Sequence, residues 1–207
     1  MISHKSIFLF LYFTASSLTY ADAPNEKETE LYIENMFSKH GRCDYLVEDM
    51  ELSREIKKNS LFFFGDKVKY EIEYSEKRKY KKNRYYESVM NFNLPSVDVI
   101  EVEEHSIDEN AKILRNTCKS KIVLVCKKPD KASGKFLNFC FTGSVTNWYG
   151  FKKGGEKLNE SESPSFTLSI PLSAENSTAQ KIKRALQHYW KLKGRTLVDE
   201  SFDEELF

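Results

Sequence analysis

The sequence lacks any apolar run long enough to cross a bilayer. Its uninterrupted apolar stretch near the N-terminus, residues 7–13, falls far short of the roughly 20 residues that a transmembrane helix needs. The basic residue Lys5 precedes this stretch, and small residues up to Ala21 follow it. This order is typical of a secretory signal peptide. We therefore expect residues 1–21 to be removed and the protein to be exported, periplasmic or secreted, with no transmembrane segment left after cleavage.

A strong net charge of either sign is also missing. The chain has 32 basic and 31 acidic residues, and loss of Lys5 with the signal peptide would make the two counts equal. A neutral chain argues against a nucleic-acid partner, because such proteins need a large positive surface. Residues 22–207 are of ordinary length for one domain. We expect a single domain there, ending in an acidic tail over residues 198–207 that could be mobile.

Sequence motifs for catalysis and cofactor binding are absent. The chain has no Gly-x-Ser-x-Gly elbow and no Gly-rich phosphate loop. His40 and Cys43 form only one half of a metal-ligand pattern. We expect no metal, no cofactor and no catalytic residues, and hence a non-enzymatic binding module. The alternative is a small-ligand carrier or a small hydrolase with an interior pocket.

An even number of cysteines remains after signal cleavage: Cys43, Cys118, Cys126 and Cys140. An oxidising compartment permits disulfides between them, and four buried free thiols are the alternative. If residues 121–127 and 135–142 form a hairpin, Cys126 and Cys140 lie roughly 13 Å apart, beyond the ~7 Å that a disulfide allows. An extended chain also separates Cys118 from Cys126. The remaining pairing is Cys43 with Cys126 and Cys118 with Cys140, which is our prediction.

Hydrophobic periodicity predicts one helix near each end of the domain. The first follows Asn25, which forms a capping pair with Glu28, and it ends at Gly41. The second covers residues 177–194, with a capping box at its start and Gly194 as its left-handed terminal residue. Its apolar face consists of Ile182, Ala185, Leu186 and Tyr189. We expect this face to be committed to the core, so the helix is not the working surface.

Between the helices the apolar residues repeat every second position, which predicts strands. The clearest strand is 67–74, and 84–94 would run back beside it as a hairpin whose tip is residues 75–83. Further strands are predicted at 97–102 and 165–171, and a second hairpin pairs 121–127 with 135–142. Residues 143–164 contain many Gly, Lys, Glu and Ser residues, which predicts a long loop.

Two surfaces are candidates for binding. The first is the tip of the first hairpin, where six positive charges lie within eight residues: Lys77, Arg78, Lys79, Lys81, Lys82 and Arg84. Such a cluster attracts an anionic ligand or surface, or a partner protein of unknown identity. The alternative is a solvated tip, charged to prevent pairing with other chains. The second is an aromatic group in the long loop: Trp148, Tyr149 and Phe151. These rings could instead fold back over the sheet.

Three stretches carry a resemblance to a known family. They are FNLPSVDVIEVEE at 92–104, SFTLSIPL at 165–172, and AQKIKRALQHYWKLKG at 179–194 with the terminal ELF. In this order the chain is similar to bacterial exported proteins of pleckstrin-homology-like (PH-like) fold. The resemblance implies an α+β, mainly β fold: a bent antiparallel barrel or sandwich with an N-terminal helix and a closing C-terminal helix. It also implies a binding module, since some intracellular relatives bind phosphoinositides through a basic hairpin similar to residues 77–84.

Overall fold

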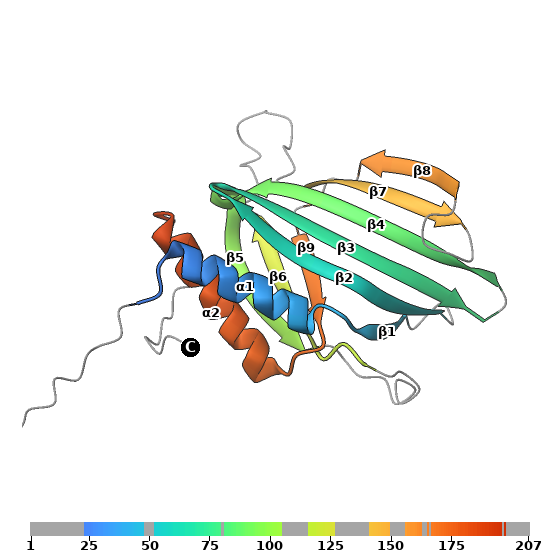
Figure 1. Cartoon of the computed structure of the whole chain (residues 1–207), viewed down its shortest axis with the longest axis horizontal. Coiled ribbons are helices and arrows are strands. Elements are labelled where there is room, and N and C mark those ends of the chain that lie inside the picture. The colour runs from blue at the N-terminus through green and yellow to red at the C-terminus, as the bar shows by residue number, and fades with distance from the viewer. Residues whose placement is uncertain are drawn as a thin grey trace, which may run out of the picture.

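The computed structural model describes residues 23–47, 52–79, 81–104, 116–126, 141–149, 156–162, 165, 167–195 and 197. Over these residues the fold is α+β and mainly β, with a helix at each end and two antiparallel sheets between them (Figure 1). The elements are α1 (Glu26–His40), β1 (Asp44–Val47), β2 (Leu52–Phe64), β3 (Lys67–Arg78), β4 (Lys81–Asn93), β5 (Val97–Glu104), β6 (Ser120–Cys126), β7 (Thr142–Tyr149), β8 (Glu156–Glu162), β9 (Thr167–Leu172) and α2 (Asn176–Leu192).

The described strands form a large sheet and a small sheet. The order is β1-β2-β3-β4-β7-β8 in the large sheet and β5-β6-β9 in the small one. The chain leaves the large sheet after β4, where Pro95 lies in a short 3-10 turn, Leu94–Ser96, because proline cannot donate to a sheet ladder. It enters the small sheet with β5 and β6, returns to the large sheet for β7 and β8, and finishes beside β6 with β9.

Helix α1 begins and ends as the sequence predicts. Asn25 Oδ1 accepts a 3.1 Å hydrogen bond from the Glu28 backbone N–H, and the Glu28 side chain bonds back to the Asn25 N–H at 2.9 Å. A Cβ atom at Gly41 would lie 2.4 Å from the Phe37 carbonyl oxygen and 2.7 Å from that of Asn59. Only glycine therefore allows the end of α1 to approach β2 so closely.

Helix α2 buries the predicted apolar face. Ile182, Ala185, Leu186 and Tyr189 are all fully buried, and Gly194 adopts the expected left-handed conformation, with φ of 70°. The predicted capping box is wrong, because the helix begins at Asn176 and its N-cap residue makes no side-chain hydrogen bond. Helix α2 packs against β5, β6 and α1, so it closes the core from the side of the small sheet (Figure 1).

One main core joins both sheets and both helices. It contains fully buried side chains from the large sheet, the small sheet and the helices, such as Leu61, Tyr70, Ile122, Ile170 and Trp190. Burying apolar surface contributes about 25 cal/mol per Å², so this shared core holds the two sheets together.

Three sequence predictions about the strands are wrong. The first hairpin has only residues 79 and 80 between its strands, because β3 and β4 pair as far as Arg78 and Lys81. The second hairpin does not form, because both neighbours of β6 are already taken, by β5 on one side and β9 on the other. The predicted loop over 143–164 contains most of β7 and the whole of β8.

The predicted disulfide pairing is also wrong. Cys43 is bonded to Cys118, with their Cα atoms 4.9 Å apart. Cys126 is disulfide-bonded too, whereas Cys140 lies outside the described residues. The error came from the assumed hairpin: its register excluded a Cys126–Cys140 bond and so favoured a different partner for Cys43. A disulfide is typical of proteins that fold in an oxidising compartment.

Candidate functional site

The structure brings the six basic candidates together at the end of a long hairpin. Strands β3 and β4 extend well past the two helices, and their shared tip lies at the end of the molecule opposite the helices (Figure 1). Lys79, Lys81 and Lys82 are exposed there. Three ammonium groups therefore lie within a few residues of one another on the outermost part of the large sheet.

Two further cations of the tip, Lys77 and Arg78, contact carboxylates close to the hairpin turn. Lys77 Nζ lies 3.0 Å from Glu55 on β2, and this pair is solvent-exposed. Arg78 Nη2 lies 3.1 Å from Glu76 Oε2. Exposed pairs contribute only about 0–1 kcal/mol, so the Lys77 pair is weak. The Arg78 pair is different, because its partner carboxylate is buried.

Glu76 is the centre of a polar network beneath the tip, and only 3% of its surface is exposed. Its Oε1 accepts a hydrogen bond from Arg54 Nε at 3.0 Å, and Arg54 Nη2 forms an ion pair with the same oxygen at 2.9 Å. Its Oε2 accepts from Arg78 and from the Tyr86 hydroxyl, each at 3.1 Å. The Arg54 guanidinium also lies 5.2 Å from the centre of the Tyr74 ring, within cation–π range. The network fixes the two strands just below the hairpin turn and so holds the tip in one orientation.

Burial and hydrogen bonding act in opposite directions on this carboxylate. Burial alone would raise the pKa of Glu76, but the hydrogen bonds from Arg54, Arg78 and Tyr86 outweigh burial and hold the pKa below its ordinary value of 4.5. Burial raises the pKa of the neighbouring Tyr74 hydroxyl to about 12. At neutral pH the network therefore contains a carboxylate anion and two guanidinium cations beside a neutral Tyr74.

Two of the three aromatic candidates lie next to the basic hairpin. Trp148 and Tyr149 are part of strand β7, opposite Tyr85 and Arg84 of β4. The third, Phe151, lies outside the described residues. The two candidate surfaces that the sequence treats separately therefore belong to neighbouring strands of one sheet.

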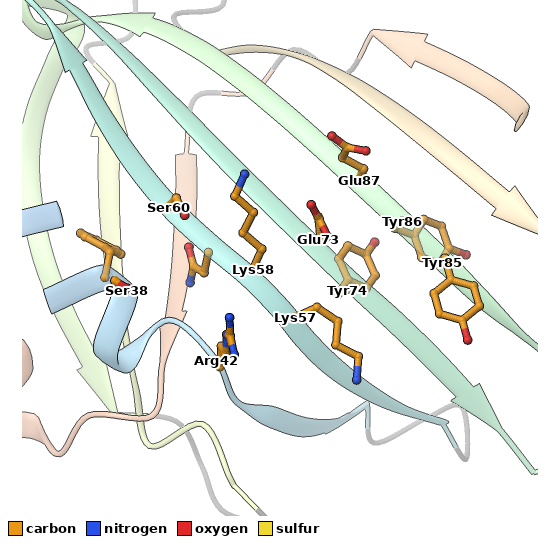
Figure 2. A pocket seen from close by; sticks show the side chains of 12 residues that line it. Ser38, Arg42, Lys57, Lys58, Ser60, Glu73, Tyr74, Tyr85, Tyr86 and Glu87 are labelled. Carbon is orange, nitrogen blue, oxygen red and sulfur yellow. The ribbon is translucent and has the colours of Figure 1, made fainter. Parts of the chain in front are cut away.

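A hollow of about 680 Å³ lies between the end of α1 and strands β2, β3 and β4. Figure 2 shows its side chains, with Ser38 and Arg42 near α1 and Tyr85 and Tyr86 at the far side. Strand register divides the sheet residues between two faces: Tyr74 and Tyr86 are direct partners on one face, and Glu73 and Glu87 are partners on the other. The described lining residues are Phe37, Ser38, Arg42, Lys57, Lys58, Asn59, Ser60, Glu73, Tyr74, Tyr85, Tyr86 and Glu87.

The sequence prediction missed Glu76 and Arg54. Glu76 is the single acidic residue in the predicted tip, residues 75–83, and it has the same parity as the apolar positions Ile72 and Tyr74 of β3. A charge at an apolar position of a strand indicates a buried partner. That partner, Arg54, is 22 residues away in the sequence, so only the pairing of β2 with β3 identifies it.

Other kinds of site find no support in the part of the chain that is described. No three histidine, cysteine or acidic side chains there are grouped so that they could hold a metal ion. Among the same residues, no helix has the length and apolar character needed to cross a membrane. Comparisons with models of protein families, with curated proteins and with solved structures find no match for this chain.

Proposed function

We propose that this protein is an exported, non-enzymatic binding module that holds an anionic ligand or surface with the tip of the β3–β4 hairpin. The observation that carries the proposal is the exposure of Lys79, Lys81 and Lys82 at the end of the molecule opposite the helices. A projecting cationic end can contact a flat or extended anion while the helices stay clear of it.

The network below the tip supports this role. A flexible lysine-rich loop would lose conformational freedom on binding, which reduces affinity. Here the strands pair almost to the turn, and the buried Glu76 joins Arg54 of β2 to Arg78 and Tyr86 of the hairpin. The lysines are therefore presented on a prearranged support.

Export and a PH-like fold belong to the same proposal. The Cys43–Cys118 disulfide supports folding in an oxidising compartment. A C-terminal helix packed against the small sheet supports the PH-like relationship. The return of β7 and β8 to the large sheet is a departure from a barrel made of consecutive strands.

Binding to vesicles tests the proposed function. We expect the full chain without its signal peptide to sediment with phosphatidylglycerol vesicles at about 50 mM salt, and to be released at about 500 mM as exposed charges are screened. Each lysine near an anionic surface contributes about 1 kcal/mol. The triple variant K79Q/K81Q/K82Q should therefore bind roughly a hundredfold more weakly.

A variant with the same net charge provides the control. Lys27, Lys39 and Lys181 are exposed on the two helices, so K27Q/K39Q/K181Q removes three charges without touching the tip. This control should bind like the wild-type protein. If both triple variants bind equally well, or if phosphatidylcholine vesicles are bound as tightly, the tip is only a solvated strand end.

A further inference from the structure

Three uncharged side chains on one face of the large sheet have a buried polar atom with no hydrogen-bond partner among the described residues: Asn59 Oδ1, Tyr70 Oη and Ser88 Oγ. The exposed fractions of these residues are 3%, 1% and 4%. Leaving a buried polar group unpaired costs about 1–3 kcal/mol. Three such groups in one place are a cost that a bound polar molecule would remove.

Strand register places the three residues close together. Asn59 and Ser88 are both direct partners of Ile72, on either side of β3, so they share a face and are separated by two strand spacings of about 4.8 Å. Tyr70 lies two positions from Ile72 on the same face.

The surroundings of these atoms are apolar, and a hollow lies next to them. Ile72 lies between Asn59 and Ser88, and Met90 lies opposite Tyr70; both pack against the main core. Asn59 lines the hollow of about 680 Å³ at the end of α1. Tyr86 lines it too and lies two positions from Ser88 on the same face, so the hollow adjoins Ser88 and Tyr70 although it is not lined by them. This volume lies within the range of about 300–1,000 Å³ that small-molecule sites occupy.

We infer that this face binds an uncharged amphiphile, an acyl chain with hydroxyl or ester oxygens at one end, which enters through the hollow. The polar end would accept and donate hydrogen bonds at Asn59, Tyr70 and Ser88, and the chain would contact the apolar residues beside them. A charged head group does not fit, because a buried charge needs a partner of opposite sign. Asn59, Tyr70 and Ser88 are uncharged side chains and supply no such partner at the three atoms.

The probe that tests this inference is 1-monolauroylglycerol, titrated below its micelle concentration into the full chain and followed by calorimetry. We expect the monoglyceride to bind saturably. Laurate, the ionised acid of the same chain length, should bind at least about tenfold more weakly at neutral pH. Tyr70→Phe and Ser88→Ala each delete one hydroxyl without adding bulk. Each should weaken binding about fivefold, while the stability of the free protein stays the same or rises because an unpaired group is lost.

Matched variants separate this site from other effects. Tyr32→Phe on α1 and Ser169→Ala on β9 delete the same groups at positions outside the large sheet and should leave binding unchanged. The tip variant K79Q/K81Q/K82Q should also bind the probe normally, so failure of the tip proposal does not affect this one. The inference is overturned if the wild-type chain does not bind the probe or if laurate binds equally well. It is also overturned if both hydroxyl deletions leave binding unchanged, which would mean that buried water satisfies these groups.

Discussion

Arg54 on β2 directs two nitrogens at a single oxygen of Glu76 on β3, with Nε at 3.0 Å and Nη2 at 2.9 Å from Oε1. The two residues are direct partners across the strands, so the ion pair lies within the sheet, close to the turn of the β3–β4 hairpin. Glu76 is 96% buried at its side chain, whereas 31% of the Arg54 side chain is exposed. The carboxylate is therefore the member of the pair that depends most on its partners.

We predict that Glu76→Gln destabilises the protein by about 3 kcal/mol, because two guanidinium groups then lose their carboxylate in a partly buried setting. Urea unfolding followed by circular dichroism measures this change. Glu101→Gln removes an exposed acid from β5 and should change stability by less than about 0.5 kcal/mol. Equal stability of the Glu76 variant and the wild-type protein would show that the network does not support the fold.

The same carboxylate predicts the direction of the acid response. The pKa of Glu76 is lower in the folded protein than its ordinary value of 4.5, so the unfolded chain takes up the proton more readily. The stability from Glu76 is complete above about pH 4.5 and is lost as the pH falls through the lower, folded pKa. Glu55 and Glu71 shift in the same direction. Urea midpoints measured between pH 6 and about pH 3 should fall, and they should fall less steeply for Glu76→Gln.

Local patterns in the sequence predicted the local structure well. The α1 capping box, the buried face of α2 and the left-handed Gly194 all depend on residues within one or two turns of each other. The mainly β class and the first hairpin followed from the two-residue period of the strands. The loop at the tip of this hairpin was predicted to be too long. Its charged residues indicated a loop, but in the structure they continue both strands.

Pairing between distant segments could not be predicted in the same way. Strand β6 has an apolar sequence that fits any neighbour, and its actual partner β9 lies more than 40 residues later. The disulfide prediction depended on that choice and was wrong for the same reason. The same limit applies to the candidate site. The lysines of the tip are close together in the sequence and could be predicted, but Arg54 and Glu76 come together only through the register of β2 and β3.

The Cys43–Cys118 bond closes a segment with a sequence separation of 75 residues. Constraining a loop of this length in the unfolded chain stabilises the folded state by about 4 kcal/mol in the chain-entropy model. We predict that the double variant C43A/C118A loses roughly 2–5 kcal/mol of unfolding free energy in urea. A proteolytic map without reductant should contain the linked Cys43 and Cys118 peptides, and a link from Cys43 to Cys126 instead would contradict the structure.

The packing of α2 gives a prediction with an internal control on the same helix. Leu186 is fully buried against the small sheet, whereas 42% of Leu192 is exposed near the helix end. Leu186→Asp would bury a charge without a partner, at a cost of more than about 4 kcal/mol, and should unfold the domain. Leu186→Ala should cost about 2–5 kcal/mol through the cavity that it leaves. Leu192→Asp should leave the protein folded, since its side chain remains in water. Circular dichroism and amide proton NMR spectra of the three variants measure these effects, and a folded Leu186→Asp protein would mean that α2 does not close the core.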